Sequence, residues 1–412
     1  MLSATRPQGR LVLLWILLLF PLFSAAQAVE TAAGDVDVAL ITVGPGEEVW
    51  ERFGHNAILV RDRATGAARL YNYGIFDFDQ ENFYLNFARG HMLYRMAVSD
   101  PADDFPAYRA EGRWIDEQDL ALDAAQRAKL VAFLDWNARP EHAQYLYEYF
   151  TANCATRVRD ALDLAVDGQI KAQTIAGSRG FTYRMDALRL MRPEPLLMLG
   201  MDAGLGPFAD RRLSHWDESF VPMEFMRQMR GVHLVDATGA ARPLVARDTL
   251  LAAGHLPEPP EFPPDWTWQA LGVGIALAAL LCGLARLHER AWARVGFGFA
   301  AGVLELAFGV AGVVLLALWT LTDHISAWRN ENLLLLDPLC LLLVPACFAS
   351  LRARWRPSPL AQRFAIAVAA LAALELFLKI FPAFPQDNRL WIALLLPVHA
   401  AVAWSLARPR SA

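Results

Sequence analysis

Cysteine is scarce in this sequence, and positive charge does not dominate it. There are 4 cysteines among 412 residues, which excludes a small domain held together by disulfides. Lys and Arg number 38 and Asp and Glu 43, for a net charge of −5. A protein that neutralises nucleic-acid phosphates needs a basic surface. The sequence therefore predicts no nucleic-acid partner.

Long hydrophobic runs are absent from the middle of the chain and occur at both ends. Residues 1–28 have the three parts of a signal peptide: a basic start with Arg6 and Arg10, an apolar run Leu11–Phe23 and a small-residue cleavage site Ala26–Ala28. Pro21 interrupts the run, which is also short for a membrane span, so we predict cleavage after Ala28. The alternative is an uncleaved anchor helix. In both cases the residues that follow are exported.

The rest of the chain divides into an exported domain, a spacer and a membrane domain. Residues 29–255 mix polar and apolar residues and are numerous enough to bury a core of their own. Residues 256–265, LPEPPEFPPD, contain five prolines and predict a stiff, extended spacer. Residues 266–412 predict an all-α membrane domain with five transmembrane helices. Its apolar segments lie near 271–287, 296–320, 333–351, 364–381 and 390–407.

Arginine is unevenly distributed between the loops of the membrane domain. Nine arginines fall on one side of the predicted bundle: Arg286, Arg290, Arg294, Arg352, Arg354, Arg356, Arg363, Arg408 and Arg410. The other side has two, Arg329 and Arg389. Because positively charged loops stay in the cytoplasm, this predicts a cytoplasmic C-terminus and an outward residue 265. Helical spans also favour the bacterial inner membrane.

Polar residues gather in the outward loop that precedes the third apolar segment. Four of them are candidates for substrate binding: Asp323, His324, Asn330 and Asn332. The loop is predicted either as a solvated connector or as a polar platform that faces the exported domain. Glu305 and Glu375 lie within apolar segments, where carboxylates usually face a bundle interior or a polar cavity.

Cys154 is the one cysteine of the exported domain. It has no partner for a disulfide there, and an idle free thiol is a liability in an oxidising compartment. Asn153 is a suitable helix N-cap, and Val158 and Leu162 follow at helical spacing, so Cys154 falls in the first turn of a predicted helix. The helix dipole there favours the thiolate. We therefore favour a nucleophile over the alternative, a buried and inert cysteine.

A thiolate nucleophile needs a base, and His55 is the candidate. Strands are predicted at 38–43, 55–61 and 70–75, and the last two form a hairpin. His55 begins the second strand, directly after Gly54, where it can open into a cleft. The alternative is a structural histidine. Asn72 is a candidate to orient the imidazole, although Tyr71 or Tyr73 would qualify in a different register.

A histidine on a strand therefore precedes a cysteine at a helix N-terminus. This order resembles the circularly permuted NlpC-type and lecithin:retinol acyltransferase-like cysteine enzymes. Five segments tighten the resemblance: ITVGPGEEVWERFGHNAILVRD, YNYGIFDF, NFARGHMLYR, YFTANCATRVRD and the outward TDHxxxxxNxNLL loop. With the multi-span tail, they are similar to the Lnb-type family of bacterial lipoprotein N-acyltransferases.

The resemblance implies an α+β, papain-like, circularly permuted periplasmic domain followed by the transmembrane bundle. It also implies an enzyme that moves an acyl chain from a phospholipid, through a cysteine thioester, to the N-terminal amine of diacylglyceryl lipoproteins. Cys154 would be the nucleophile and His55 the general base. We predict no metal and no cofactor.

Two other functions stay open at this point. NlpC-type folds commonly serve cysteine peptidases or amidases that act on cell-wall peptides, and the exported domain could also be a non-catalytic binding module. The membrane half distinguishes the acyltransferase from the cell-wall peptidase or amidase. A wall hydrolase needs only an anchor, whereas several spans with polar outward loops suit a substrate held at the bilayer.

Overall fold

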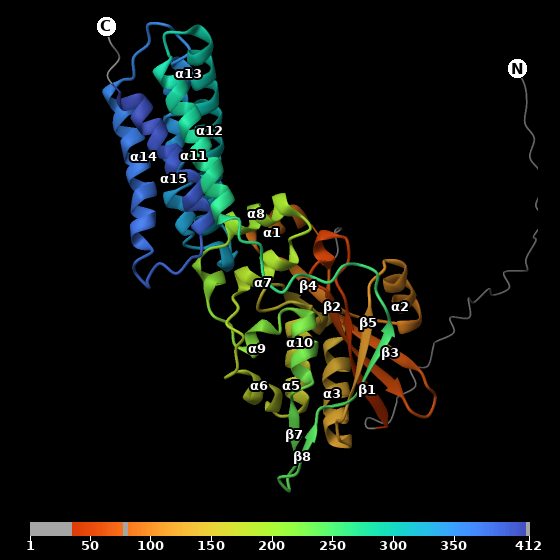
Figure 1. Ribbon diagram of the computed structural model, residues 1–412. Helices are drawn as coiled ribbons and strands as arrows, with labels where there is room; N and C mark the ends of the chain where they lie inside the picture. Colours follow the sequence, from red (N-terminus) through yellow and green to blue (C-terminus); the bar gives the residue numbers. More distant parts are fainter. Residues whose placement is uncertain (1–34, 77–80, 409–412) are drawn as a thin grey trace, which may run out of the picture.

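The computed structural model describes residues 35–76 and 81–408, which form an α+β domain and a long helical bundle at one end of it (Figure 1). The predicted signal peptide, residues 1–28, lies outside the described residues. The class predicted for the first domain, α+β with an antiparallel sheet, is confirmed.

A seven-stranded antiparallel sheet forms the centre of the α+β domain, in the order β6-β4-β3-β2-β1-β5-β9. The strands are β1 Val36–Val43, β2 His55–Asp62, β3 Ala68–Ile75, β4 Leu93–Ser99, β5 Ile115–Leu120, β6 Gln144–Leu146 and β9 Val245–Ala252. The predicted hairpin is β2–β3, in which Ala57 pairs with Asn72. A separate two-stranded sheet joins β7 His233–Val235 to β8 Ala241–Pro243.

Helices cover both faces of the sheet. On one face, Leu40 and Ile58 pack with Leu134 of α3 (Ala124–Asn137) and Val158 of α5 (Cys154–Ala165). On the other face, residues of the same strands pack against Phe105 of α2 (Pro101–Ala110). Alternation along the strands thus supplies apolar side chains to two cores. Burial of each large apolar side chain stabilises the folded state by about 1.5–3 kcal/mol.

Short helices fill the region between α5 and the last strand. They are α6 Gln169–Thr174, α7 Tyr183–Leu190, α8 Pro195–Gly204, α9 His215–Glu218 and α10 Pro222–Met229, preceded in the chain by α1 Phe83–Arg89 and α4 Pro140–Ala143. Arg184 of α7 is buried with Asp202 and Asp210, its ion-pair partners at 2.7 and 2.9 Å. β9 then returns to the sheet edge beside β5. The proline-rich spacer follows it without helix or strand, and Phe262 stacks on Phe181 at 5.4 Å.

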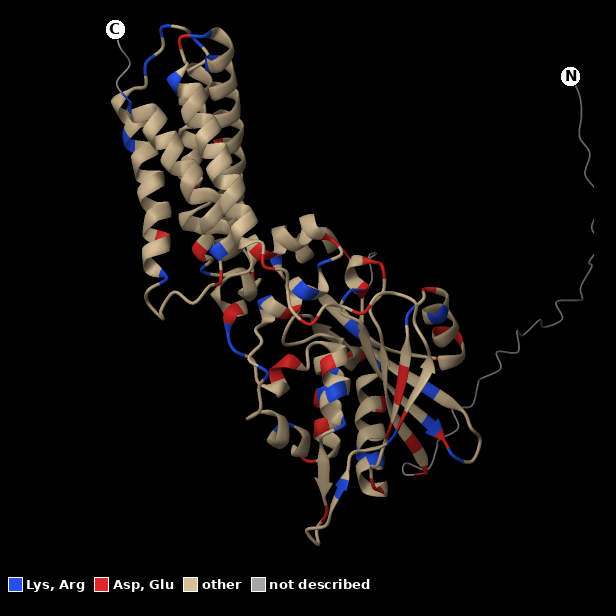
Figure 2. Cartoon of the chain, viewed as in Figure 1, with Lys and Arg blue, Asp and Glu red and all other residues tan. Residues whose placement is uncertain are grey.

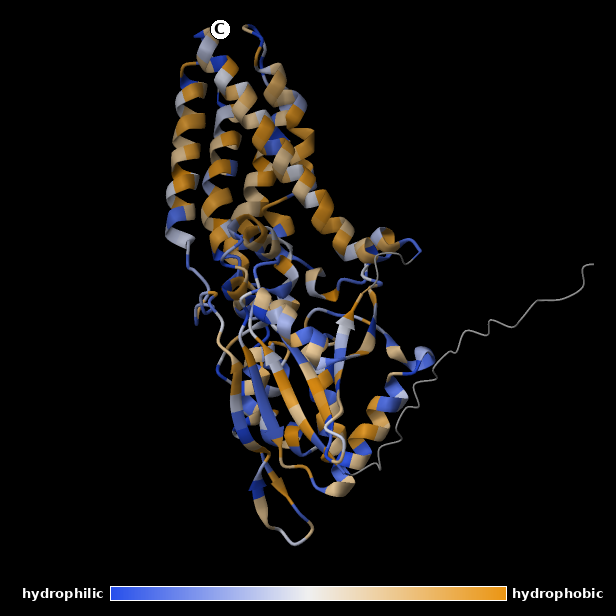
Figure 3. Ribbon diagram, turned by 90° about the vertical axis from the view of Figure 1, so that its right-hand side faces the viewer, coloured by the Kyte–Doolittle hydropathy of each residue, from blue (hydrophilic) through white to orange (hydrophobic). Residues whose placement is uncertain are grey.

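Four helices of the described chain are long and apolar enough to cross a membrane: α11 Thr267–Arg286, α12 Ala291–Leu321, α14 Pro359–Leu378 and α15 Arg389–Ala407. Hydrophobic residues cover most of the bundle (Figure 3). Most charged residues of the bundle lie at its two ends, and the arginine-rich loops are at the end remote from the α+β domain (Figure 2).

The prediction of a fifth continuous helix is wrong. Residues 333–351 form three short pieces instead: the end of η4 Glu331–Leu334, then η5 Pro338–Leu342 and α13 Val344–Ala349. Pro338 and Pro345 lack the N–H groups that a continuous helix requires.

The interrupted segment nevertheless runs antiparallel to α12 and in close contact with it. A Cβ atom on Gly312 would lie 2.2 Å from the carbonyl oxygen of Leu336, and a Cβ atom on Gly298 would lie 2.9 Å from that of Cys347. Glycine on α12 therefore lets an irregular backbone approach a regular helix inside the bundle.

Candidate active site

Cys154 is the first residue of α5, where the N-cap fixes its position. The Asn153 side chain accepts a hydrogen bond from the Thr156 amide at 3.0 Å and donates one to the carbonyl of Phe220 at 2.8 Å. Ala155 and Val158 anchor the helix in the core, with no measurable exposure. The thiol is left partly accessible at the helix N-terminus, where the dipole and free amides favour a thiolate.

His55 begins β2 and is oriented by Asn72 on the neighbouring strand. Its Nε2 lies 2.9 Å from Oδ1 of Asn72, an acceptor, so Nε2 carries the proton and donates it. The Asn72 amide in turn donates to Oγ of Ser99 at 2.8 Å. The register excludes the two tyrosine alternatives, because Tyr71 and Tyr73 donate their hydroxyl protons to residues of α3.

The His55 imidazole also hydrogen-bonds with the thiol of Cys154. Nε2 is engaged with Asn72, so Nδ1 is the ring nitrogen that is free to exchange a proton with the thiol. The structure therefore brings Cys154, His55 and Asn72 together in one row.

The surroundings of this pair favour a thiolate and an imidazolium. Burial opposes the charged form of Cys154, but the hydrogen bond and charge of His55 and the backbone N–H groups of Asn56 and Ala155 bring the pKa of the thiol below its ordinary value. Burial likewise opposes a charged His55, but Cys154 and Asn72 raise its pKa above the ordinary value. Both shifts have the direction that an activated nucleophile requires.

Stacked aromatic rings connect the site to the membrane domain. Tyr147, close enough for its hydroxyl to interact electrostatically with Cys154, stacks on Tyr94 with ring centroids 4.3 Å apart. Tyr149 packs edge-on against Tyr147 at 6.0 Å and stacks on His324 of the outward loop, also at 6.0 Å. The sequence shows this aromatic run, YLYEYF at 145–150, but not its contact with His324.

Asp323 and His324 contact the C-terminal end of α1 and the loop that follows it. The backbone N–H of Asp323 donates to the carbonyl oxygen of Arg89 at 2.8 Å, and the Asp323 carboxylate lies 2.5 Å from Nε2 of His91. His324 Nε2 lies 3.1 Å from the carbonyl oxygen of Phe87. Both side chains thus belong to the contact between the two domains, on the side of Cys154.

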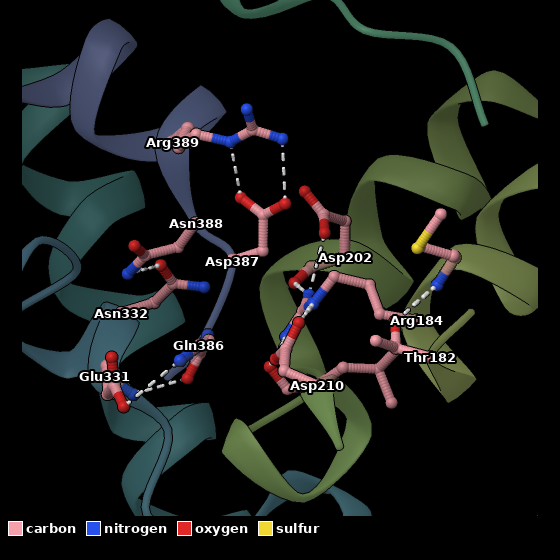
Figure 4. Close-up of polar contacts among 12 residues, drawn as sticks. Thr182, Arg184, Asp202, Asp210, Glu331, Asn332, Gln386, Asp387, Asn388 and Arg389 are labelled. Carbon is pink, nitrogen blue, oxygen red and sulfur yellow. Dashed lines mark hydrogen bonds and ion pairs between the residues drawn. The ribbon is translucent and has the colours of Figure 1, made fainter. Parts of the chain in front are cut away.

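Asn330 and Asn332 occupy a different place, with exposures of 2% and 0%. Both side chains donate to the carbonyl oxygen of Ala203 at the end of α8, at 2.8 and 3.0 Å. Asn332 also accepts from Asn388 at 3.0 Å, within a buried polar network (Figure 4). The structure therefore separates the four predicted substrate-binding residues: two lie on the side of Cys154, and two fasten α8 to the bundle.

The buried network continues into the bundle. Asn388 donates to Glu375 at 2.8 Å, and Lys379 forms ion pairs with Glu375 and Glu331. Glu375 therefore faces the bundle interior, as expected for a carboxylate in an apolar segment. The sequence does not reveal its partners, which both lie in the connection between α14 and α15.

The fold and the site define a membrane protein that carries a cysteine–histidine pair on a domain outside the bilayer. Residues 24–191 match the family model described as the Lnb N-terminal periplasmic domain, and residues 273–407 match the model of the Lnb transmembrane domain. The chain belongs to the Lnb family, as the sequence motifs predicted. It is a membrane protein with a periplasmic N-terminal domain and several spans. No curated protein and no solved structure matches the chain.

Proposed function

We propose that the protein is a lipoprotein N-acyltransferase with Cys154 as its nucleophile. The observation that carries the proposal is the hydrogen-bonded pair of Cys154 and His55 on a periplasmic domain that contacts a membrane bundle. The acyl donor is a phospholipid, and the acceptor is the N-terminal amine of a diacylglyceryl lipoprotein. Membership of the Lnb family supports this choice of substrates.

In the first half-reaction, the Cys154 thiolate attacks the carbonyl carbon of the donor ester. The backbone N–H groups of Asn56 and Ala155 face the sulfur and are placed to stabilise the oxygen that becomes negative. The ester C–O bond breaks, and the His55 imidazolium gives its proton to the departing alkoxide. The products are a thioester on Cys154 and a lysophospholipid.

In the second half-reaction, the neutral amine of the lipoprotein attacks the thioester. Nδ1 of His55 accepts the proton that the amine loses as the amide forms, and Cys154 leaves as a thiolate. The starting ion pair is restored. Asn72 holds the imidazole in the tautomer that both steps use, because its carbonyl oxygen requires a proton on Nε2.

The position of the site suits a lipid substrate. Exposing an acyl chain to water costs about 0.8 kcal/mol per CH₂, so the ester is best attacked at the membrane surface. α1, which contacts His324, has exposed apolar side chains: Tyr84 is 82% exposed, and Leu85 and Phe87 are also exposed. α8, fastened to the bundle, exposes Leu196 at 86%. Both helices lie at the end of the α+β domain that meets the bundle (Figure 1), so their exposed apolar side chains could contact the bilayer.

We propose the inner membrane as the location, with a cytoplasmic C-terminus and a catalytic domain formed by residues 29–255. The arginine-rich loops at the far end of the bundle support this orientation (Figure 2). The proposal retains the papain-like, circularly permuted relationship, supported by the order of the histidine strand and the cysteine helix. Asp323 and His324 are proposed to bind the phospholipid headgroup or the incoming amine. Asn330 and Asn332 are proposed to hold the outward loop in place.

Mass spectrometry of lipoprotein N-termini tests the function. In a bacterial strain depleted of its own lipoprotein N-acyltransferase, the wild-type chain is expected to restore an amide-linked acyl chain, and Cys154→Ala is expected to restore none. Cys347→Ser, which changes a buried bundle cysteine, is the matched control and should behave as wild type. Restoration by Cys154→Ala would contradict the proposal. Altered cell-wall peptides without lipoprotein acylation would identify a peptidase or amidase instead.

A further inference from the structure

Three potential metal ligands lie together inside the bundle, on segments that the proposed reaction does not use. Glu305 lies halfway along α12, Cys340 in η5 and His399 halfway along α15. One ligand atom from each lies within 4.8 Å of the others. Their exposures are 0%, 0% and 1%. They form the one such cluster among the described residues.

The polar atoms of this cluster are incompletely paired. Neither carboxylate oxygen of Glu305 has a well-oriented hydrogen-bond partner in the described part of the chain, although the Cys340 thiol lies beside the carboxyl group. Nδ1 of His399 also lacks a partner among these residues. Unpaired polar atoms in an apolar bundle are costly, so a bound ligand or a counter-charge would stabilise the arrangement.

His399 is oriented as metal-binding histidines usually are. Its Nε2 donates to the carbonyl oxygen of Leu335 at 2.8 Å, which leaves the lone pair on Nδ1. A histidine ligand commonly donates its other ring N–H to a backbone carbonyl, which fixes the tautomer and the direction of the lone pair. Phe308 packs edge-on against the ring at 5.4 Å and restricts its rotation.

We propose that Glu305, Cys340 and His399 bind a zinc ion. One thiolate, one carboxylate and one neutral imidazole balance the two charges of the ion, so the occupied site is neutral within the apolar bundle. Zinc accepts sulfur, nitrogen and oxygen ligands together, whereas the thiolate disfavours magnesium and calcium. Binding displaces the thiol proton of Cys340, and the carboxyl proton of Glu305 where it is present, to solvent.

The distances in the cluster permit such a site. Tetrahedral zinc with bonds of about 2.0–2.3 Å places its ligand atoms about 3.5 Å apart, so the three atoms need to approach by roughly 1 Å. The fourth position is left for water or for the second carboxylate oxygen. The ion would tie the interrupted segment to α12 and α15, at the part of the bundle where a continuous helix is missing.

Metal analysis of the full-length protein, purified in detergent, tests the proposal. We expect about one zinc per chain, and X-ray absorption should show a single sulfur neighbour at about 2.3 Å. Cys340→Ser and His399→Ala should lower bound zinc roughly tenfold or more. Cys347→Ser, another buried cysteine of the same bundle, should retain it.

A second measurement covers the case in which these variants fail to fold. Treating the wild-type chain with a chelator should lower its melting temperature, and added zinc chloride should restore it. A wild-type chain that holds no stoichiometric zinc, even after incubation with zinc chloride, would overturn the proposal. So would a Cys340→Ser variant with a full complement of zinc. Neither outcome depends on acyl transfer by Cys154.

Discussion

The imidazole of His324 lies nearly parallel to the ring of Tyr149, at an interplanar angle of 18°. Tyr149 belongs to the aromatic run that leads into the nucleophile helix, and His324 belongs to the outward loop of the membrane domain. This contact joins the two domains on the side of Cys154. It suggests that the loop affects acyl transfer as well as attachment.

His324→Ala is therefore expected to reduce lipoprotein acylation by about tenfold while Cys154 remains reactive, since one positioned side chain typically contributes 1–2 kcal/mol. The measurement is the acylated fraction of lipoprotein N-termini at equal expression. His324→Phe keeps the stacking on Tyr149 but removes the polar atoms, so it separates the stacking role of His324 from its proposed role in substrate binding. An acylated fraction in His324→Ala equal to that of the wild type would indicate that the loop is only a connector.

Alkylation of Cys154 should extend to lower pH than that of an ordinary thiol. The lowered pKa of Cys154 keeps the thiolate present below the usual thiol range, near 8.5. His55→Ala removes the hydrogen bond and charge that stabilise the thiolate, so the midpoint of alkylation against pH should rise. Turnover should fall by about a hundredfold or more.

The rate of iodoacetamide labelling, followed by mass spectrometry across a pH series, measures this midpoint. Cys154 is the labelled residue, and Cys347 is the internal control because it is buried. An unchanged midpoint in His55→Ala would remove the imidazole from the activation of the thiol.

Asn72 is expected to act as a positioning residue. Asn72→Ala removes a hydrogen bond that raises the pKa of His55, so the imidazolium should lose its proton at lower pH and the alkaline limit of activity should move downward. We expect kcat to fall by about tenfold to a hundredfold with little change in KM. Asn137→Ala, at another hydrogen-bonded asparagine of the same domain, is the control for a general loss of packing. A pH profile identical to wild type would contradict the assigned role.

Gly312→Ala should destabilise the membrane bundle. The added Cβ would lie 2.2 Å from the carbonyl oxygen of Leu336, so the interrupted segment would have to move. Overpacking of this kind costs about 1–3 kcal/mol, which should appear as a lower melting temperature in detergent. Gly272→Ala on α11 is the matched control, because nothing lies within 4 Å of its added Cβ. Equal melting temperatures of the two variants would refute close packing at Gly312.

The sequence predicted the row of Cys154, His55 and Asn72 because its signals are local. An N-cap places a cysteine at a helix N-terminus, and strand alternation with a tight hairpin places an asparagine opposite the histidine strand. The structure brings the three side chains together, and their catalytic roles stay a proposal. The residues that orient Asn72 were not predictable, because they follow from the pairing of β3 with β4.

The third membrane segment shows what hydropathy alone misses. Residues 333–351 are as apolar as a transmembrane helix, but prolines deprive the backbone of helical hydrogen bonds, and α12 supplies glycines for close contact. Composition also could not separate Asp323 from Asn332. Their different environments depend on α1 and α8, which the sequence did not identify. The cluster at Glu305 was hidden for the same reason, since its members come from three segments.

The hydrogen bonds from Asn330 and Asn332 to α8 have a mechanical consequence. A body tethered by a single flexible point can turn in every direction, and each additional fixed point removes a rotational degree of freedom. The periplasmic domain is held by the covalent spacer, by the two asparagine hydrogen bonds to Ala203 and by the contact of Asp323 with Arg89. These contacts hold Cys154 at a fixed position relative to the membrane bundle. Under the proposed function, lipids and lipoproteins would have to reach Cys154 by lateral diffusion, so membrane fluidity would limit the reaction at low temperature.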